Sequence, residues 1–369
     1  MKPLYLKPTW TSAGATFAER DGAEIVSTFS DSATEYKTIR DAVGLTDFSF
    51  VSMYRFPEEA AIDFLDSVLA CNVARTRFGR MVHTLLSDPE GNILADCYVA
   101  NNDEEFILLC ETIESADALD AILKAHGAEA AQMECRNETH VLLGLDGVDA
   151  WKVVRELFGP DVLGLPYLSV EMYPFEDEQI TLFRAGKTSE FGYMIMAPVA
   201  VAEALCSKLC TLVKDAGGGL CGVEIHNDLR LEGRFFNIQQ EGRLVRDPLV
   251  LGLQWMIDFE KEAFRGSDAV FAKREQGATQ KIIGVSAAPD CEQLTPGAKI
   301  FSDGQPVAEV VTTCFSHVLD RRLGLAVFPV EIAYAGLEFT MGADEGPKVK
   351  TISMPPIMPK SLSIRLDEM

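Results

Sequence analysis

Three apolar segments follow one another closely in the first third of the chain, and short polar turns separate them. "MVHTLL" (Met81–Leu86) is the first, and "GNILADCYVANNDEEFILLC" (Gly91–Cys110) contains the other two. The connection "SDPEGN" carries the Asp, Pro, Gly and Asn residues that favour turns, and "NNDEE" forms a second polar connection. Strands joined this closely pair as an antiparallel meander. Any fold of the chain has to contain this sheet.

Helical patterns lie on both sides of the predicted meander. Glu58–Val73 carries apolar residues at helical spacing, including Phe64, Leu65 and Val68. Glu114–Gly127 reads as a second helix, in which Ser115 is the expected N-cap and the final glycine ends the helix. The first unit therefore runs helix, three strands, helix.

The rest of the chain predicts a second α+β unit and a small all-β unit. "HVLLGLDG" begins a strand, the helix "VDAWKVVRELFG" follows, and two strands precede the long helix "VAVAEALCSKLCTLVKDAG". From Gln280 the pattern changes to short strands with Gly and Asp turns, and a Pro-rich tail is expected to wrap around the body. The predicted class is α+β, with units at 1–139, 140–279 and 280–369.

The composition limits which partners the protein is expected to bind and indicates the cellular compartment in which it is expected to work. With 33 Lys and Arg against 56 Asp and Glu, the net charge is −23, which disfavours nucleic-acid and anionic-membrane partners. The longest apolar runs reach about ten residues, whereas a membrane span needs about 20, and no signal peptide is expected. Nine Cys without a C-x-x-C pair and five His without ligand spacing predict free thiols in a reducing cytoplasm and no metal site.

Asp96 lies in the middle of the second predicted strand, where aspartate is uncommon. Leu94, Asp96 and Tyr98 share one face because successive side chains alternate, and both faces of the strand are largely apolar. A buried carboxylate is unfavourable by several kcal/mol unless it has a partner. Asp96 is therefore either a structural residue satisfied by a backbone or Arg partner, or a functional carboxylate.

Six segments resemble, in order, motifs of the glycine cleavage T-protein family of tetrahydrofolate-dependent one-carbon transferases. The resemblance covers about residues 45–328. The segments are "LTDFSFVSMYRF", "GNILADCYV", "FRAGKTSEFGYMI", "NDLRLEGR", "DPLVLGLQWMIDFEKEAFRG" and "CFSHVLDRRLGLAVF". The resemblance implies a three-part, ring-like fold of two α+β units and a small C-terminal β-barrel, with folate in a central channel.

The resemblance assigns roles to two carboxylates. Asp96 matches the family residue next to the reactive folate nitrogens, where a carboxylate stabilises the positive charge that develops on N5 and can take its proton. Glu190 matches the residue that holds the pterin ring, since a carboxylate accepts two parallel hydrogen bonds from the 2-amino and N3 groups. The alternative for Glu190 is a solvated loop residue.

Four further residues are candidates on weaker grounds. His83 and Tyr98 are expected to line the folate channel, although a core histidine bonded to the backbone is the alternative for His83. Arg230 is expected to pair with a carboxylate, either of folate or of the neighbouring Glu232. An ether donor would also need a general acid to protonate the departing alkoxide, and His226, His83 or Tyr98 could supply it.

Several positions depart from the family pattern, and they bear on the donor. Phe50 stands where the family has His, Lys187 and Ser189 replace a Tyr and a Gly, and His226-Asn227 lies near the family's Arg-Asp. Phe50 and His226 are therefore predicted to face the substrate. The departures favour a tetrahydrofolate-dependent methyltransferase that demethylates a small methylated donor. The alternatives are an aminomethyltransferase acting with a lipoyl carrier protein and, third, a non-catalytic folate-binding protein.

Overall fold

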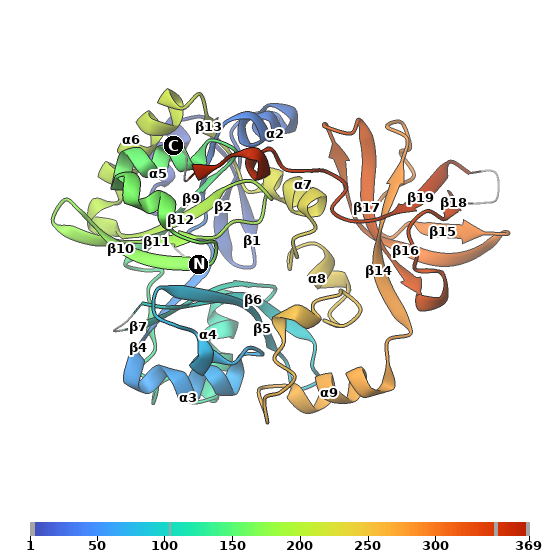
Figure 1. Ribbon diagram of the computed structural model, residues 1–369, viewed down its shortest axis with the longest axis horizontal. Helices are drawn as coiled ribbons and strands as arrows, with labels where there is room; N and C mark the ends of the chain where they lie inside the picture. Colours follow the sequence, from blue (N-terminus) through green and yellow to red (C-terminus); the bar gives the residue numbers. More distant parts are fainter. Residues whose placement is uncertain (1–3, 103–104, 343–345, 367–369) are drawn as a thin grey trace.

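The protein is an α+β molecule in which one large sheet and a separate β-barrel are connected by a mainly helical segment. The computed structural model describes residues 4–102, 105–342 and 346–366. Figure 1 shows two lobes on the left, the barrel on the right, and α7, α8 and α9 between them. The two lobes on the left hold the large sheet.

The helices cover the large sheet and connect it to the barrel. The described α-helices are α1 (Lys7–Ser12), α2 (Ser32–Asp41), α3 (Glu58–Val68), α4 (Ala116–Ala125), α5 (Ala150–Phe158), α6 (Val199–Asp215), α7 (Glu224–Gly233), α8 (Glu241–Leu244) and α9 (Ser267–Gln276). Ser115 caps α4 by accepting a hydrogen bond from the Ala118 amide, which confirms the predicted N-cap.

The large sheet has eleven strands in the order β13-β3-β9-β12-β11-β10-β5-β6-β7-β4-β8. Their bounds are β3 (Gly44–Asp47), β4 (Ser52–Pro57), β5 (Arg80–Ser87), β6 (Ile93–Asn101), β7 (Glu105–Thr112), β8 (Glu134–Cys135), β9 (His140–Asp146), β10 (Ser169–Phe175), β11 (Glu178–Arg184), β12 (Gly192–Pro198) and β13 (Gly219–Leu220). Strands β5, β6 and β7 form the predicted antiparallel meander. Part of its second connection, Asp103 and Glu104, lies outside the described residues.

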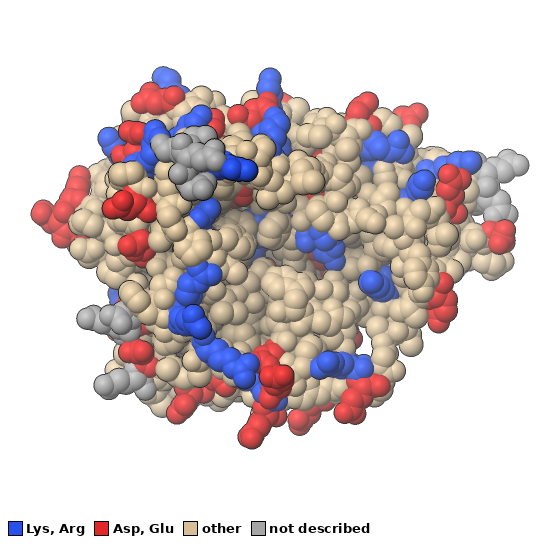
Figure 2. All heavy atoms as spheres, viewed as in Figure 1, with Lys and Arg blue, Asp and Glu red and all other residues tan. Residues whose placement is uncertain are grey.

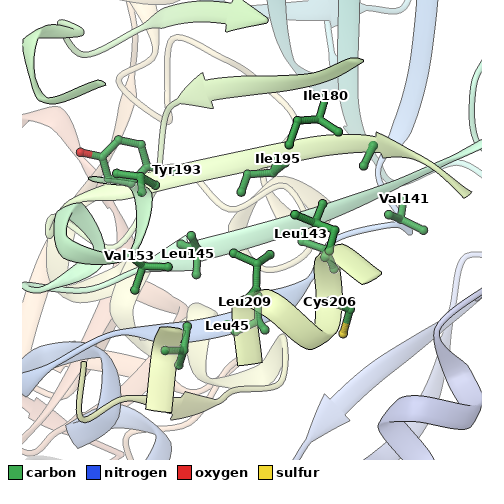
Figure 3. Close-up of a cluster of buried hydrophobic side chains, with 14 of the residues drawn as sticks. Leu45, Val141, Leu143, Leu145, Val153, Ile180, Tyr193, Ile195, Cys206 and Leu209 are labelled. Carbon is green, nitrogen blue, oxygen red and sulfur yellow. The ribbon is translucent and has the colours of Figure 1, made fainter. Parts of the chain in front are cut away.

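The two halves of the sheet meet where Ser169 of β10 pairs with Arg80 of β5. Each half has its own apolar core. Figure 3 shows the core between β9, β12 and α6, to which Leu45 of β3 also contributes. Leu6 and Trp10 of the first helical segment belong to this same core. Residues before β4 thus pack with the predicted second unit, and the boundaries 1–139, 140–279 and 280–369 stay predictions.

The C-terminal β-barrel begins at the residue where the sequence pattern changes. Six strands close it in the order β14-β17-β16-β15-β18-β19. They are β14 (Gln280–Ala287), β15 (Lys299–Ser302), β16 (Gln305–Ser316), β17 (Arg321–Pro329), β18 (Glu338–Met341) and β19 (Lys348–Ile352), and a small hairpin of β1 (Thr16–Arg20) and β2 (Ala23–Thr28) lies apart. The predicted α+β class with a C-terminal barrel is confirmed.

The tail after β19 leaves the barrel and returns to the upper-left lobe (Figure 1). There its short 3-10 turn, Lys360–Ser363, contacts the loop before β12. Within the described ranges, no helix has both the length and the apolar character needed to cross a membrane.

Candidate active site

Two acidic residues face each other across neighbouring strands of the meander. Asp96 of β6 pairs in register with Glu111 of β7, so both side chains point to the same face of the sheet. Strand β6 is buried along its whole length, and Asp96 is only 2% exposed. Two adjacent carboxylates in such a place require cations close by.

Lys187 supplies the first of these cations. It belongs to the loop between β11 and β12, is only 6% exposed, and reaches across to both carboxylates. Its Nζ lies 2.5 Å from Asp96 Oδ2 and 2.9 Å from Glu111 Oε1. The loop is shaped by a close backbone approach, because a Cβ on Gly186 would come within 2.7 Å of the Gly192 Cα.

Arg230 and His83 complete the set of partners. Arg230 of α7 binds Glu111 with two parallel hydrogen bonds of 2.8 Å each, the bidentate geometry that guanidinium groups favour. The His83 Nε2 atom lies 2.5 Å from Asp96 Oδ1. The His83 ring also stacks on Tyr98, with ring centroids 4.3 Å apart.

These contacts keep both carboxylates ionised. Burial raises the pKa of Asp96, but the charge of Lys187 and the hydrogen bond from His83 outweigh it and leave the pKa below its usual value. Arg230 and Lys187 likewise outweigh burial at Glu111 and lower its pKa. Burial lowers the pKa of His83, so the ring is neutral near pH 7 and donates its N–H to Asp96.

The acidic pair opens into a cavity. Charged groups lie at one part of its wall, and most of the rest is apolar. The lining includes Asp96, Glu111, Lys187 and Arg230, together with Phe48, Val51, Leu109 and Met194. A cavity with a mainly apolar wall and a few convergent charged groups is typical of a site for a small organic molecule.

The structure brings most of the predicted site residues to this cavity. The residues that line it are Asp96, Tyr98, Arg230 and His226. His83 does not line it but contacts Asp96 and Tyr98. Burial raises the pKa of Tyr98 well above its usual range. Burial and Arg230 lower the pKa of His226 to about 3. His83, Tyr98 and His226 are all neutral near pH 7, and none of them is a strong acid at that pH.

Phe50 lies beside the cavity and does not line it. It lines an adjacent cavity that shares Glu111 with the first one. The Arg20 guanidinium lies 5.9 Å from the centre of the Phe50 ring, within reach of a cation–π contact. Glu111 is the residue that lines both cavities.

Glu190 is placed away from the cavity. Its carboxylate accepts hydrogen bonds from the backbone amides of Lys360 and Ser361, at 3.2 and 2.9 Å, and from Arg40 at 3.3 Å. The alternative of a solvated loop residue is wrong, because Glu190 is 8% exposed. Its role toward a pterin ring stays a prediction.

The alternative that Arg230 pairs with Glu232 is wrong. The two side chains leave α7 in different directions, and Glu232 binds Arg40 instead, at 2.8 Å. Arg230 finds its partner on β7, 119 residues earlier in the chain.

Sequence reasoning missed Glu111 and the contacts of Lys187. The meander register contained a signal for Glu111. Asn101 pairs with Phe106 next to the turn. Counting five residues away from the turn along each strand places Glu111 opposite Asp96. No local signal predicts that Lys187 reaches Asp96, because the two residues are far apart in the sequence.

Comparison with known proteins adds a family and a fold. A family model described as the GCVT N-terminal domain matches residues 6–261. An aminomethyltransferase from Mycobacterium leprae is 28% identical over 324 residues, which are 87% of this chain and 86% of the relative. One from Bacillus subtilis is 26% identical over 321 residues, covering 85% and 87% of the two chains.

A solved structure shares the fold. It is the glycine cleavage system aminomethyltransferase T from Bartonella henselae, with 23% identity and a TM-score of 0.82, covering 96% of this chain and 98% of that one. At this identity the likeness supports the fold alone.

Proposed function

The chain belongs to the GCVT family, and on that premise we propose that it transfers an aminomethyl group from a carrier-bound donor to tetrahydrofolate. A one-carbon transferase activity that uses tetrahydrofolate is the property of the family as a whole. Curated relatives that align with most of this chain carry the name aminomethyltransferase, which supports the finer proposal over demethylation.

The observation that carries the proposal is the ionised carboxylate of Asp96 at the wall of the cavity. Two hydrogen bonds fix its orientation, one from Lys187 at 2.5 Å and one from His83 at 2.5 Å. A preorganised carboxylate in a site that excludes water stabilises positive charge more strongly than one in solution. Asp96 is therefore the residue that we assign to the reacting nitrogen.

The residues around the cavity fit a reduced pterin. Such a ring presents amino and ring N–H donors and one carbonyl acceptor, and the cavity offers carboxylates and cationic N–H groups. The Arg230 Nε atom is buried and has no hydrogen-bond partner among the described residues, so it is one available donor. When bound, tetrahydrofolate supplies the nucleophilic N5 nitrogen.

The roles of this chain's residues follow from these contacts. Asp96 stabilises the charge that develops at N5 and accepts its proton. Arg230 holds Glu111 in place, and Phe48 and Met194 exclude water from the reacting groups. The Tyr98 ring positions His83 by stacking and so helps to orient Asp96.

A lipoyl carrier protein is the proposed partner for the aminomethyl donor. The net charge of −23 is unfavourable for an acidic partner when the molecule is taken as a whole. Figure 2 shows, however, that the charges are unevenly spread, with a run of basic side chains over the lower-left lobe, where Figure 1 places α3 and β5. A local basic surface of this kind is compatible with an acidic partner.

Methyl transfer from a small methylated donor is the second candidate. The adjacent cavity, lined by Phe50 and Arg20 and sharing Glu111 with the first one, supports it. A small methylated donor needs no carrier protein to reach such a site.

One incubation distinguishes the two candidates. The protein is mixed with tetrahydrofolate and either an aminomethylated lipoyl carrier protein or a panel of methoxyaromatic, betaine and sulfonium compounds. Formation of 5,10-methylenetetrahydrofolate and ammonia only when the aminomethylated carrier is the donor supports aminomethyl transfer. Formation of 5-methyltetrahydrofolate without a carrier supports methyl transfer. Failure to bind tetrahydrofolate in an equilibrium titration contradicts both.

A further inference from the structure

We propose that Lys187 is the acid that protonates the atom leaving the transferred carbon, and that donors of this enzyme therefore carry their one-carbon unit on a neutral sulfur or oxygen. The inference rests on the proposed function and adds to it the chemical class of the donor. It concerns a position at which the resemblance leads one to expect a tyrosine.

The geometry of Lys187 leaves one of its protons unused. A lysine ammonium has three N–H donors, and its hydrogen bonds to Asp96 and Glu111 account for two of them. Among the described residues, no third acceptor is within hydrogen-bond distance of the Nζ atom, which lies 5.3 Å from the centre of the Tyr98 ring. The side chain is 94% buried yet lines the cavity, so its remaining N–H is available to a bound molecule.

The other titratable groups around the cavity are less suited to the role. His83 and His226 are neutral near pH 7, and the phenol of Tyr98 is a weak acid. Arg230 keeps its proton, since Glu111 holds its pKa above the usual value. Asp146 is the one competitor, because burial raises its pKa to about 7, although Thr188 already donates a hydrogen bond to it at 3.2 Å.

The protons balance within the Lys187–Asp96 pair. As the bond from N5 to the transferred carbon forms, the bond from that carbon to the sulfur or oxygen breaks, and the electron pair stays on the leaving atom. Lys187 gives its free proton to that atom, and Asp96 takes the proton from N5. The 2.5 Å contact between Asp96 and Lys187 then returns the proton to the lysine. No oxidant, reductant or further co-reactant is needed.

The same balance defines the donor class. A thiolate or alkoxide leaves as an anion and benefits from an acid, because the proton removes the charge as it develops. The neutral product of a sulfonium or quaternary ammonium donor needs no proton, and an ammonium group placed against such a cation would repel it. Lys187 thus favours thioether-type and ether-type donors and disfavours onium donors.

The test separates proton donation from the mere presence of charge. Lys187→Ala removes the ammonium, and Lys187→Arg keeps a cation that does not release a proton near neutral pH. We expect both variants to lose about 10²–10⁴-fold in the first-order rate of product formation at saturating substrates. Added propylamine is expected to restore part of the Lys187→Ala rate, whereas methylguanidinium is not.

A second readout is independent of turnover. Tetrahydrofolate binding, measured by isothermal titration, is expected to change less than about threefold in Lys187→Arg, since the buried carboxylates keep a cation. Loss of binding in this variant, wild-type rates in it, or equal rescue by methylguanidinium would each overturn the proposal. So would an equally large loss of rate in Asp146→Asn.

The wild-type protein distinguishes failure of this inference from failure of the proposed function. Product formation from a carrier thioether or an ether, together with the rate losses expected for Lys187→Ala and Lys187→Arg, supports the inference. Product from betaine or sulfonium donors alone overturns it while one-carbon transfer to folate stands. No product from any donor overturns both.

Discussion

Two buried acidic clusters lie on either side of the loop between β11 and β12, and they differ in what faces them. In the first, which we call the cavity cluster, Asp96 and Glu111 meet Lys187 and open into the cavity described above. In the second, the tail cluster, Glu190 and Glu232 meet Arg40, Tyr36 and the C-terminal tail. In both clusters two carboxylates share a cation, Lys187 in the first and Arg40 in the second.

The tail cluster leaves little capacity for a ligand. The Tyr36 hydroxyl is 2.8 Å from both oxygens of Glu232, and Arg40 donates to Glu232 at 2.8 Å. The Ser361 amide donates a hydrogen bond to the Glu190 carboxylate at 2.9 Å. Arg40 also donates to the Thr188 carbonyl at 2.7 Å and so fixes the loop that carries the neighbouring lysine. The same residue types thus line a cavity in one cluster and bind the C-terminal tail in the other.

The largest expected effect is the loss of turnover in Asp96→Asn. The amide cannot accept the N5 proton and stabilises positive charge poorly, so we expect the turnover rate to fall about 10²–10⁴-fold. The measurement is the steady-state rate of folate product formation, together with a circular dichroism spectrum to confirm folding.

Asp47→Asn is the matched control. Asp47 is also a buried carboxylate, bound to the Trp10 indole at 2.6 Å and to the Ser49 amide at 2.9 Å, but it does not line the cavity. We expect it to affect stability and leave the turnover rate within a few-fold of wild type. A nearly normal rate in Asp96→Asn would remove the distinction between the two clusters.

The second prediction concerns the cation of the tail cluster. Arg40→Met leaves Glu190 and Glu232 without their shared partner, and breaking a buried ion pair on one side typically destabilises a protein by about 3–5 kcal/mol. The free energy of unfolding in urea reports this loss. If the variant unfolds like wild type, the cluster is not the structural element that we describe.

How well the sequence predicts these clusters depends on how far apart the contacting residues are along the chain. Strand alternation predicts that Asp96 is buried, and turn residues predict the meander and the start of the barrel near Gln280, because these signals are local. Lys187 meets Asp96 across 91 residues, and Arg40 meets Glu232 across 192. Such pairs are fixed by tertiary packing, and no periodicity records them.

The same limit applies to the fold. The sequence patterns predict the strands β9, β10 and β11 and the helices α5 and α6 of the second unit, but they miss β12 (Gly192–Pro198). They also do not show that β3, from the first fifty residues, pairs with β9. Each strand satisfies its own pattern, and the choice of partner depends on the shared core around α6. The resemblance narrows the fold because it carries tertiary information that the local patterns lack.

The third prediction tests Glu190 in two ways. Glu190→Gln replaces an acceptor oxygen with an N–H group that faces other donors, and an unsatisfied buried polar group costs about 1–3 kcal/mol. We expect the free energy of unfolding to fall by that amount and tetrahydrofolate affinity to stay within a few-fold of wild type. A tenfold or greater loss of affinity in the folded variant would instead support the pterin role implied by the resemblance.

The smallest effect is expected where the tail contact is exposed to solvent. The Lys360 ammonium lies 2.5 Å from Asp41, but 58% of the lysine side chain and 42% of the aspartate side chain are exposed. Exposed ion pairs contribute about 0–1 kcal/mol, so Lys360→Ala should lower the free energy of unfolding by no more than that. The backbone amides of Lys360 and Ser361 still reach Glu190 in this variant. A loss as large as that of Glu190→Gln would mean that the exposed side chain, rather than the buried backbone, holds the tail in place.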